Sequence, residues 1–114
     1  PFEAAAEVGP RAVMVGHIVV PELTGDLPAT LCADAIALVP DAENTLIVTD
    51  SLAMGAITDS YTPGEAAVQA LQAGCDVLLM PDGLADAYDA VLAAVQNGTL
   101  SEDRLDLSVN KVYV

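Results

Sequence analysis

The sequence predicts an α/β protein with parallel strands, because strand-like and helix-like segments alternate along the chain. Three short apolar runs, at residues 12–15, 46–48 and 77–80, are continuous rather than alternating. Such runs are typical of strands that are buried on both faces of a parallel sheet. Helical signals lie between and after these runs, so we expect a chain of βα repeats.

The first two expected helices lie on either side of the first strand. Residues 1–7 have the pattern of a helix end that precedes this strand. A weaker helix is predicted over residues 32–39, and Pro40 ends it because proline does not continue a helix.

The third expected helix begins at a capping box. Thr62 and Glu65 have the required spacing, and Pro63 occupies the first helical position. The helix continues through residues 66–73 and ends at Gly74, because glycine favours the left-handed residue that closes a helix. The third predicted strand follows directly.

The last two expected helices are amphipathic. The first of them spans residues 84–95, has one apolar stripe and is followed by a turn at residues 97–98. The stripe consists of Leu84, Ala87, Tyr88, Val91, Leu92 and Val95. Ser101 begins the final helix, and the acidic Glu102 and Asp103 stabilise its first turn.

Composition indicates one folded domain over residues 1–114. The chain is 54% hydrophobic and 18% charged, whereas disordered chains have few apolar residues and a high charge density. Its formal charge is 3 basic minus 17 acidic residues, or −14, which argues against nucleic-acid binding and against an anionic membrane surface. No stretch approaches the roughly 20 consecutive apolar residues of a membrane span.

The chain begins with Pro1 rather than Met, so we expect an excerpt or a processed product.

The sequence lacks the patterns of several common sites. Its one histidine and two cysteines do not have metal-ligand spacing. It has no glycine-rich phosphate loop and no Gly-x-Ser-x-Gly elbow. The low cysteine content is compatible with a cytosolic protein and equally with a secreted bacterial one, so the compartment stays open.

Two architectures agree with this order of elements. One is a small open α/β sheet, and the other is the last portion of a (β/α)₈ barrel, which needs about 250 residues to close. Both place ligand chemistry at the carboxyl ends of the strands, where His17, Asp50 and Asp82 follow the three predicted strands. Asp50 directly ends a buried strand and is therefore the best candidate for a site carboxylate. His17 fits a structural role and a functional one equally well.

Longer motifs resemble family 3 glycoside hydrolases, most closely the β-N-acetylhexosaminidase branch. The resemblance covers nearly the whole chain in order and spacing. It is carried by VMVGHIVVP at 13–21, PATL at 28–31, IVTDSLAMGAI at 47–57, PGEAA at 63–67, ALQAGCDVLLMP at 70–81 and RLDLS at 104–108.

This resemblance implies a retaining glycosidase on a (β/α)₈ barrel, of which residues 1–114 form one piece with strands six to eight. It implies that Asp50 is the nucleophile, that His17 lines the sugar subsite and that Met54 packs near the sugar. The implied substrate is a carbohydrate with terminal β-linked N-acetylglucosamine or another hexosamine. The implied chemistry uses an acid, a base and a nucleophile, so no cofactor is expected.

Other readings remain open at this point. The general acid/base of that branch lies outside residues 1–114, so we expect this chain alone to be inactive. A truncated or degenerate barrel module with a structural or binding role is the alternative, favoured by the shortened segment at 33–44 and by the absence of the acid/base loop; Thr45 also stands where the family has glycine. A third reading is an unrelated open α/β domain that binds a small ligand.

A barrel piece has unpaired strand edges, so we expect the isolated chain to self-associate or to refold into an open sheet.

Overall fold

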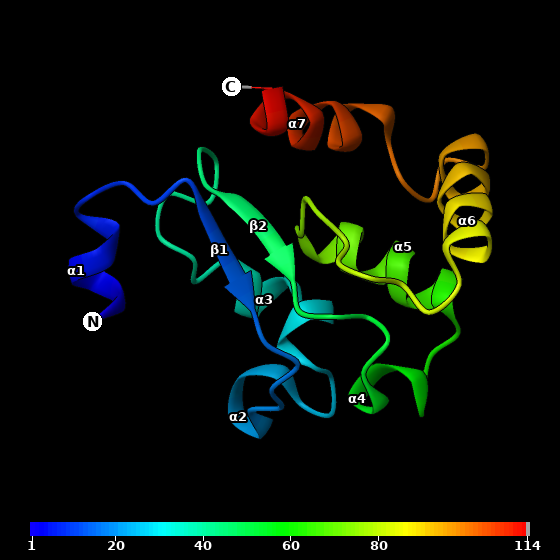
Figure 1. The fold of residues 1–114 in the computed structure, drawn as a ribbon, viewed down its shortest axis with the longest axis horizontal. Helices are drawn as coiled ribbons and strands as arrows, with labels where there is room; N and C mark the ends of the chain where they lie inside the picture. Colours follow the sequence, from blue (N-terminus) through cyan, green and yellow to red (C-terminus); the bar gives the residue numbers. More distant parts are fainter. Residues whose placement is uncertain (114) are drawn as a thin grey trace.

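The computed structural model describes residues 1–113 and confirms a mixed α/β chain (Figure 1). In chain order the elements are α1 (Phe2–Ala6), β1 (Ala12–Val15), α2 (Pro21–Thr24), the 3₁₀ turn η1 (Ala29–Leu31), α3 (Ala33–Ile36), β2 (Leu46–Thr49), α4 (Gly55–Thr58), α5 (Pro63–Ala73), α6 (Leu84–Gln96) and α7 (Glu102–Tyr113). None of these helices is long and apolar enough to cross a membrane.

The sheet consists of β1 and β2, which pair in parallel as the apolar runs predict. The register sets Ala12 opposite Leu46 and Val15 opposite Thr49. The two strands therefore end side by side, and the residues that follow them leave the same edge of the sheet.

The prediction of a third strand over residues 77–80 is wrong. This segment lies parallel to β2 and forms one isolated bridge, between Val48 and Val77. The ladder stops there because the N–H of Leu79 donates to the side-chain oxygen of Thr49, at 3.0 Å, instead of to a backbone carbonyl. Met80 then takes a φ of 47°, outside the extended region, and ends the strand-like course.

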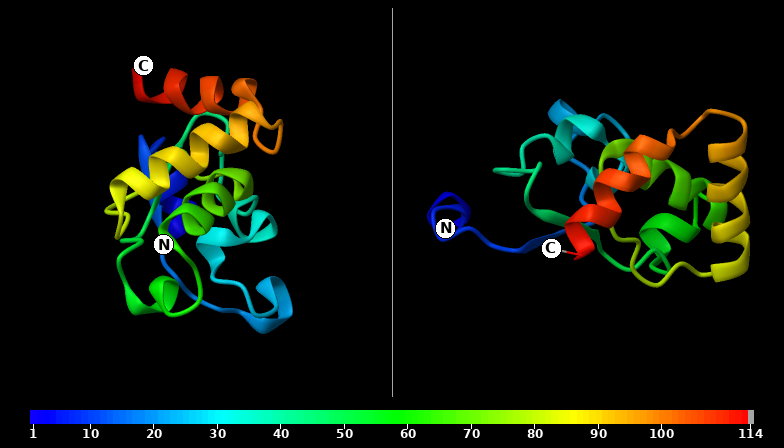
Figure 2. Two further views of the ribbon diagram at one scale, coloured as in Figure 1. Left: turned by 90° about the vertical axis from the view of Figure 1, so that its right-hand side faces the viewer. Right: turned by 90° about the horizontal axis from the view of Figure 1, so that it is seen from above.

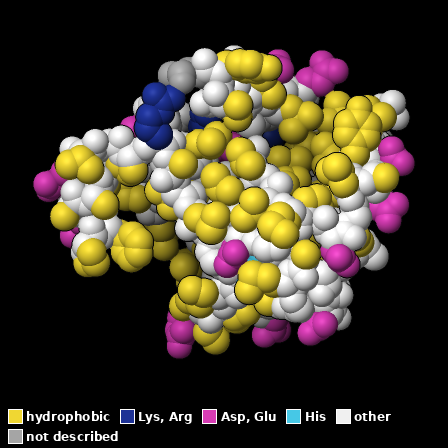
Figure 3. Space-filling view, viewed as in Figure 1, with side chains coloured by type: hydrophobic (Ala, Val, Ile, Leu, Met, Phe, Trp, Pro, Cys, Tyr) yellow, Lys and Arg dark blue, Asp and Glu magenta, His cyan; other side chains and the backbone are white. Residues whose placement is uncertain are grey.

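The strands are also not buried on both faces, contrary to the prediction. Side chains alternate along β2: Ile47 and Thr49 are buried, and the intervening Val48 is half-buried. In β1, Met14 is 56% exposed. The buried side packs against residues from α3, α4 and α5, whereas the other side lacks a covering layer among residues 1–113, and Figure 3 shows many hydrophobic side chains on that face.

The longer predicted helices are confirmed. In α5, the Glu65 N–H donates to the Thr62 hydroxyl at 3.2 Å and the Thr62 N–H donates to the Glu65 carboxylate at 2.9 Å, which is the expected capping box. Gly74 closes this helix with a φ of 117°. Helix α6 forms where its apolar stripe predicts, but only part of the stripe is covered: Val91 and Val95 pack against the cluster around Leu71 and Leu100, whereas Leu84, Tyr88 and Leu92 are exposed. The predicted helix at 32–39 shortens to one turn, α3.

The N-terminal helix α1 stands apart from the rest of the molecule (Figure 2). It spans Phe2–Ala6, as its sequence pattern predicts, but has no buried residue. An extended segment connects it to β1. The single-turn elements α2, η1 and α4 were not predicted, because one turn is too short to give a helical periodicity.

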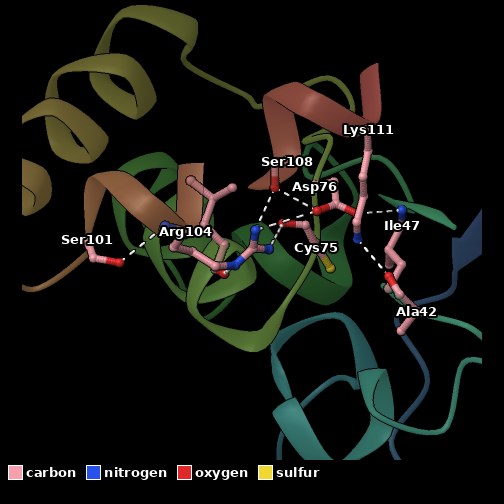
Figure 4. A network of polar contacts seen from close by, with 9 residues as sticks. Ala42, Ile47, Cys75, Asp76, Ser101, Arg104, Ser108 and Lys111 are labelled. Atoms are coloured by element: carbon pink, nitrogen blue, oxygen red, sulfur yellow. Dashed lines mark hydrogen bonds and ion pairs between the residues drawn. The ribbon is translucent and has the colours of Figure 1, made fainter. Parts of the chain in front are cut away.

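A buried ionic network ties the amino-terminal end of β2 to α7 (Figure 4). The Asp76 side chain is fully buried, and its two carboxylate oxygens accept from the Ile47 N–H at 2.9 Å, Ser108 Oγ at 2.6 Å and Lys111 Nζ at 2.8 Å. Arg104 Nη1 lies 3.5 Å from the same carboxylate. Burial alone raises the pKa of Asp76, but the bonds from Lys111, Ser108 and Ile47 outweigh it and hold that pKa below its ordinary value.

Candidate active site

The candidate site lies at the opposite end of the sheet, where β1 and β2 finish. The Asp50 N–H donates to the Val15 carbonyl at 2.9 Å, which continues the strand pairing by one residue. His17 and Asp50 therefore leave neighbouring strand ends, as expected from the rule that parallel strands present their chemistry at one edge. Asp82, which follows the third apolar run, is exposed and forms no hydrogen bond to this pair within the described part of the chain.

The loop that carries Asp50 has a partner for every backbone N–H from residue 50 to residue 54. Beyond the bond from Asp50 to Val15, the Leu52 N–H donates to the Leu79 carbonyl at 2.9 Å. The Ala53 N–H donates to the Ser51 hydroxyl and the Met54 N–H to the Ser51 carbonyl. A loop whose backbone donors are all satisfied has few alternative conformations of similar energy, so this loop is a well-defined support for a side chain.

The two oxygens of the Asp50 carboxylate have different surroundings. Oδ1 accepts from the Ser51 N–H at 2.8 Å. Among residues 1–113, Oδ2 accepts no hydrogen bond, and no buried side-chain oxygen in that range lacks a partner, so Oδ2 reaches solvent. One oxygen thus orients the group while the other is free to react.

His17 forms hydrogen bonds with protein atoms through both ring nitrogens. Nδ1 lies 2.7 Å from Thr30 Oγ1, and Nε2 lies 2.8 Å from the Ser51 carbonyl oxygen. A carbonyl only accepts, so Nε2 carries a proton, and in the neutral imidazole Nδ1 then accepts from the Thr30 hydroxyl. The imidazole therefore connects the segment after β1 to the loop after β2.

Met54 lies at the amino end of α4, four residues beyond Asp50. The residue is 44% exposed, and its carbonyl accepts from the N–H groups of Ile57 and Thr58. Its backbone is therefore fixed by the first turn of α4 and its side chain is available at the surface.

Thr30 and Ser51 are parts of this site that the sequence did not single out. Thr30 is fully buried in η1, and both residues contact His17 across a long stretch of chain. The only signal was that PATL at 28–31 and IVTDSLAMGAI at 47–57 belong to the motifs of the family resemblance. Among residues 1–113, no group of three or more His, Cys, Asp or Glu side chains is placed to hold a metal ion.

The chain is an α/β protein with two parallel strands, and an accessible carboxylate, Asp50, follows the carboxyl end of β2. A family model described as "Glycosyl hydrolase family 3 N terminal domain" matches residues 1–114. The chain therefore belongs to glycosyl hydrolase family 3, which confirms the resemblance seen in its motifs.

Named relatives agree with this membership. The chain is 32% identical to the β-hexosaminidase LpqI of Mycobacterium tuberculosis over 98% of its own length and 31% of that protein. The solved structure of a family 3 β-N-acetylglucosaminidase from Paenibacillus sp. FPU-7 superposes with a TM-score of 0.90 and 39% identity, over 98% of this chain and 23% of that one. The solved structure of M. tuberculosis LpqI superposes with a TM-score of 0.82 and 33% identity, over 91% of this chain and 33% of that one. The chain thus spans a third or less of these relatives.

Proposed function

We propose that the full-length protein containing this chain is a retaining glycosidase that removes terminal β-linked N-acetylglucosamine or a related hexosamine, with Asp50 as its nucleophile. The observation that carries the proposal is the asymmetric Asp50 carboxylate, with Oδ1 bonded to the Ser51 N–H and Oδ2 open to solvent. The substrate class is supported by the names of the relatives, a β-hexosaminidase and a β-N-acetylglucosaminidase.

The proposed reaction has two steps. In the first, Asp50 Oδ2 attacks the anomeric carbon, the bond from that carbon to the leaving oxygen breaks, and a general acid outside residues 1–114 protonates the leaving group. In the second, water attacks the same carbon, its proton passes to the general base, and the Asp50 carboxylate is released. The Ser51 N–H supports the carboxylate in both steps because it bonds the oxygen that does not react.

His17 and Met54 complete the proposed sugar subsite. Both His17 nitrogens are bonded to protein, so its contact with a sugar is through the ring carbons. The exposed Met54 side chain packs against the sugar from the other end of the loop.

The finer architecture belongs to the same proposal. We infer that residues 1–114 are one piece of a (β/α)₈ barrel, with β1 and β2 in the places of strands six and seven and residues 77–80, which form one bridge only, in the place of strand eight. We also infer that this piece alone is inactive because it lacks an acid/base partner for Asp50. The open face of the sheet and the superposition on only 23% of the Paenibacillus enzyme support this inference.

Covalent trapping tests the function directly. The full-length protein is incubated with an activated fluorinated N-acetylglucosaminide, digested, and its peptides are weighed. We expect a sugar-sized mass gain on the peptide that contains Asp50 and none in Asp50→Asn. Asp89→Asn is the matched control, because Asp89 is an exposed residue of α6. An unlabelled wild-type protein without turnover of aryl glycosides would instead favour a non-catalytic barrel module.

We also propose that the isolated chain associates with copies of itself. The outer edge of β1 pairs with no strand among residues 1–113, and an apolar groove of about 480 Å³ lies between α1, β1 and α3. Sedimentation of residues 1–114 should show dimers or larger species at micromolar concentration. A well-folded monomer would contradict this proposal.

A further inference from the structure

The geometry points to Thr30 and His17 as a pair of positioning residues that hold the Ser51 carbonyl and so fix the loop that presents Asp50. The inference rests on the proposed function, because it assigns these residues a part in the reaction of the Asp50 carboxylate. It gives His17 a defined role in catalysis that differs from recognition of the sugar.

The first step of the argument is the peptide group between Ser51 and Leu52, which is bonded at both ends. His17 Nε2 donates to its carbonyl at 2.8 Å, and its N–H donates to the Leu79 carbonyl at 2.9 Å. This peptide adjoins the Ser51 N–H that bonds Asp50 Oδ1. Rotation of the peptide therefore moves the donor that orients the carboxylate.

The second step is that His17 itself is oriented by Thr30. The Thr30 hydroxyl lies 2.7 Å from Nδ1, and within residues 1–113 it has no other hydrogen-bond partner. Thr30 is fully buried in η1, and its carbonyl accepts a bond from the buried Cys75 thiol at 3.5 Å. Without the Thr30 hydroxyl, Nδ1 loses its partner and the ring is free to rotate away from Ser51.

The third step is that η1, which carries Thr30, is itself held by the packed interior of the protein. The Ala29 N–H donates to the Ile18 carbonyl at 2.8 Å, so η1 is also joined to the residue that follows His17. Leu31 of η1 belongs to the core that contains Ile47 of β2. The Asp50 carboxylate is thus connected to the core through Ser51, His17 and Thr30. Residues in this position orient functional groups in other sites by hydrogen bonds from behind.

The test compares variants of the full-length protein that separate positioning from binding and from stability. Thr30→Val removes the hydroxyl and keeps the shape, and Thr30→Ser restores it. Thr24→Val is the matched control: Thr24 is also buried, and its hydroxyl bonds the backbone of Val20 instead of His17.

We expect Thr30→Val to lower kcat and the rate of Asp50 labelling by about 10–100-fold, the range found when a supporting hydrogen bond behind an active group is lost. KM should stay within about threefold, because a positioning residue acts on the transition state rather than on ground-state binding. Thr30→Ser should recover most of the rate, and Thr24→Val should keep the wild-type kcat. In ¹⁵N NMR spectra, His17 of the wild-type protein should carry its proton on Nε2, and Thr30→Val should shift the Nδ1 resonance.

The possible results distinguish the two proposals. A raised KM with unchanged kcat in Thr30→Val would mean that His17 acts only by binding the sugar and would overturn the positioning role. A wild-type labelling rate in that variant would overturn it as well. A His17 proton on Nδ1 in the wild-type protein would overturn the inference even if Thr30→Val failed to fold. A wild-type protein that neither turns over substrate nor becomes labelled would refute the proposed function, and the positioning role with it.

Discussion

Replacing Asp76 by asparagine is expected to destabilise the fold by about 3 kcal/mol, which is the lower end of the cost of breaking a buried ion pair. Each Asp76 oxygen faces two donors: Oδ1 faces Ser108 and Arg104, and Oδ2 faces Ile47 and Lys111. An amide replaces one of these oxygens by a nitrogen that is itself a donor. Two of the four contacts are therefore lost in either orientation, together with the negative charge.

The size of the effect follows from how far the partners are buried. Hydrogen bonds to a charged group contribute about 1.5–3 kcal/mol each, so two of them suggest about 3–6 kcal/mol. The Arg104 and Lys111 side chains keep 21% and 15% of their surface exposed. They recover part of their hydration when the carboxylate is neutralised, so the lower end of the range is expected.

Equilibrium unfolding in urea, followed by circular dichroism, measures this difference. Asp89→Asn provides the control, because it removes the same charge from the exposed face of α6 and should change the free energy of unfolding by less than about 0.5 kcal/mol. If Asp76→Asn and Asp89→Asn had the same midpoint and slope, the reasoning about the buried network would be refuted.

The same network predicts a pH dependence. The pKa of Asp76 in the folded protein lies below its ordinary value of 3.8, so the folded state holds this proton more weakly than the unfolded chain. The stabilisation is therefore fully present above about pH 4 and is lost as the pH falls through the depressed folded-state pKa. Asp76→Asn should lack this component of acid unfolding, and an unchanged acid profile in the variant would contradict the assignment.

Two further changes test the core. Burial, and to a lesser extent the nearby Asp76 charge, raises the pKa of the Cys75 thiol to about 12. Iodoacetamide at pH 8 should therefore alkylate Cys75 in the denatured protein but only very slowly in the native one. Rapid labelling of the native protein, detected by mass spectrometry, would be evidence against a closed core. A methyl group added at Gly64 would lie 2.6 Å from the Ala90 side chain, so Gly64→Ala should cost about 1–3 kcal/mol. The double variant with Ala90→Gly should regain part of the lost melting temperature, and an unchanged melting temperature in Gly64→Ala would show that α5 and α6 have room to separate.

The elements that the sequence predicted correctly are those with local signals. The capping box at Thr62 and the apolar stripe of α6 depend on residues three or four positions apart, and both helices form where they are expected. Asp50 directly follows β2, as the sequence predicted, and its role as a site carboxylate stays a prediction. The motifs predicted the family, which the composition alone does not reveal and which the match over residues 1–114 confirms.

What the sequence did not predict depends on contacts between distant residues. Residues 77–80 have the composition of a buried strand, but the Thr49 hydroxyl, 30 positions before Leu79, takes the place of a ladder partner. Thr30 and His17 are 13 positions apart and share no motif spacing. Continuous apolar runs suggested burial on both faces, whereas in residues 1–113 only the helix-facing side is covered.

The Asp76 network also bears on the order in which the chain is made. Its cations lie 28 and 35 positions beyond the carboxylate they neutralise, so a ribosome releases Asp76 and the apolar run after it well before Lys111. During that interval neither Arg104 nor Lys111 is available to neutralise the acid, and closing the amino end of β2 would bury its charge without these two partners. Final closure of this end of the molecule is thus delayed until α7 has been synthesised, and helices α5 and α6 have time to pack against each other first.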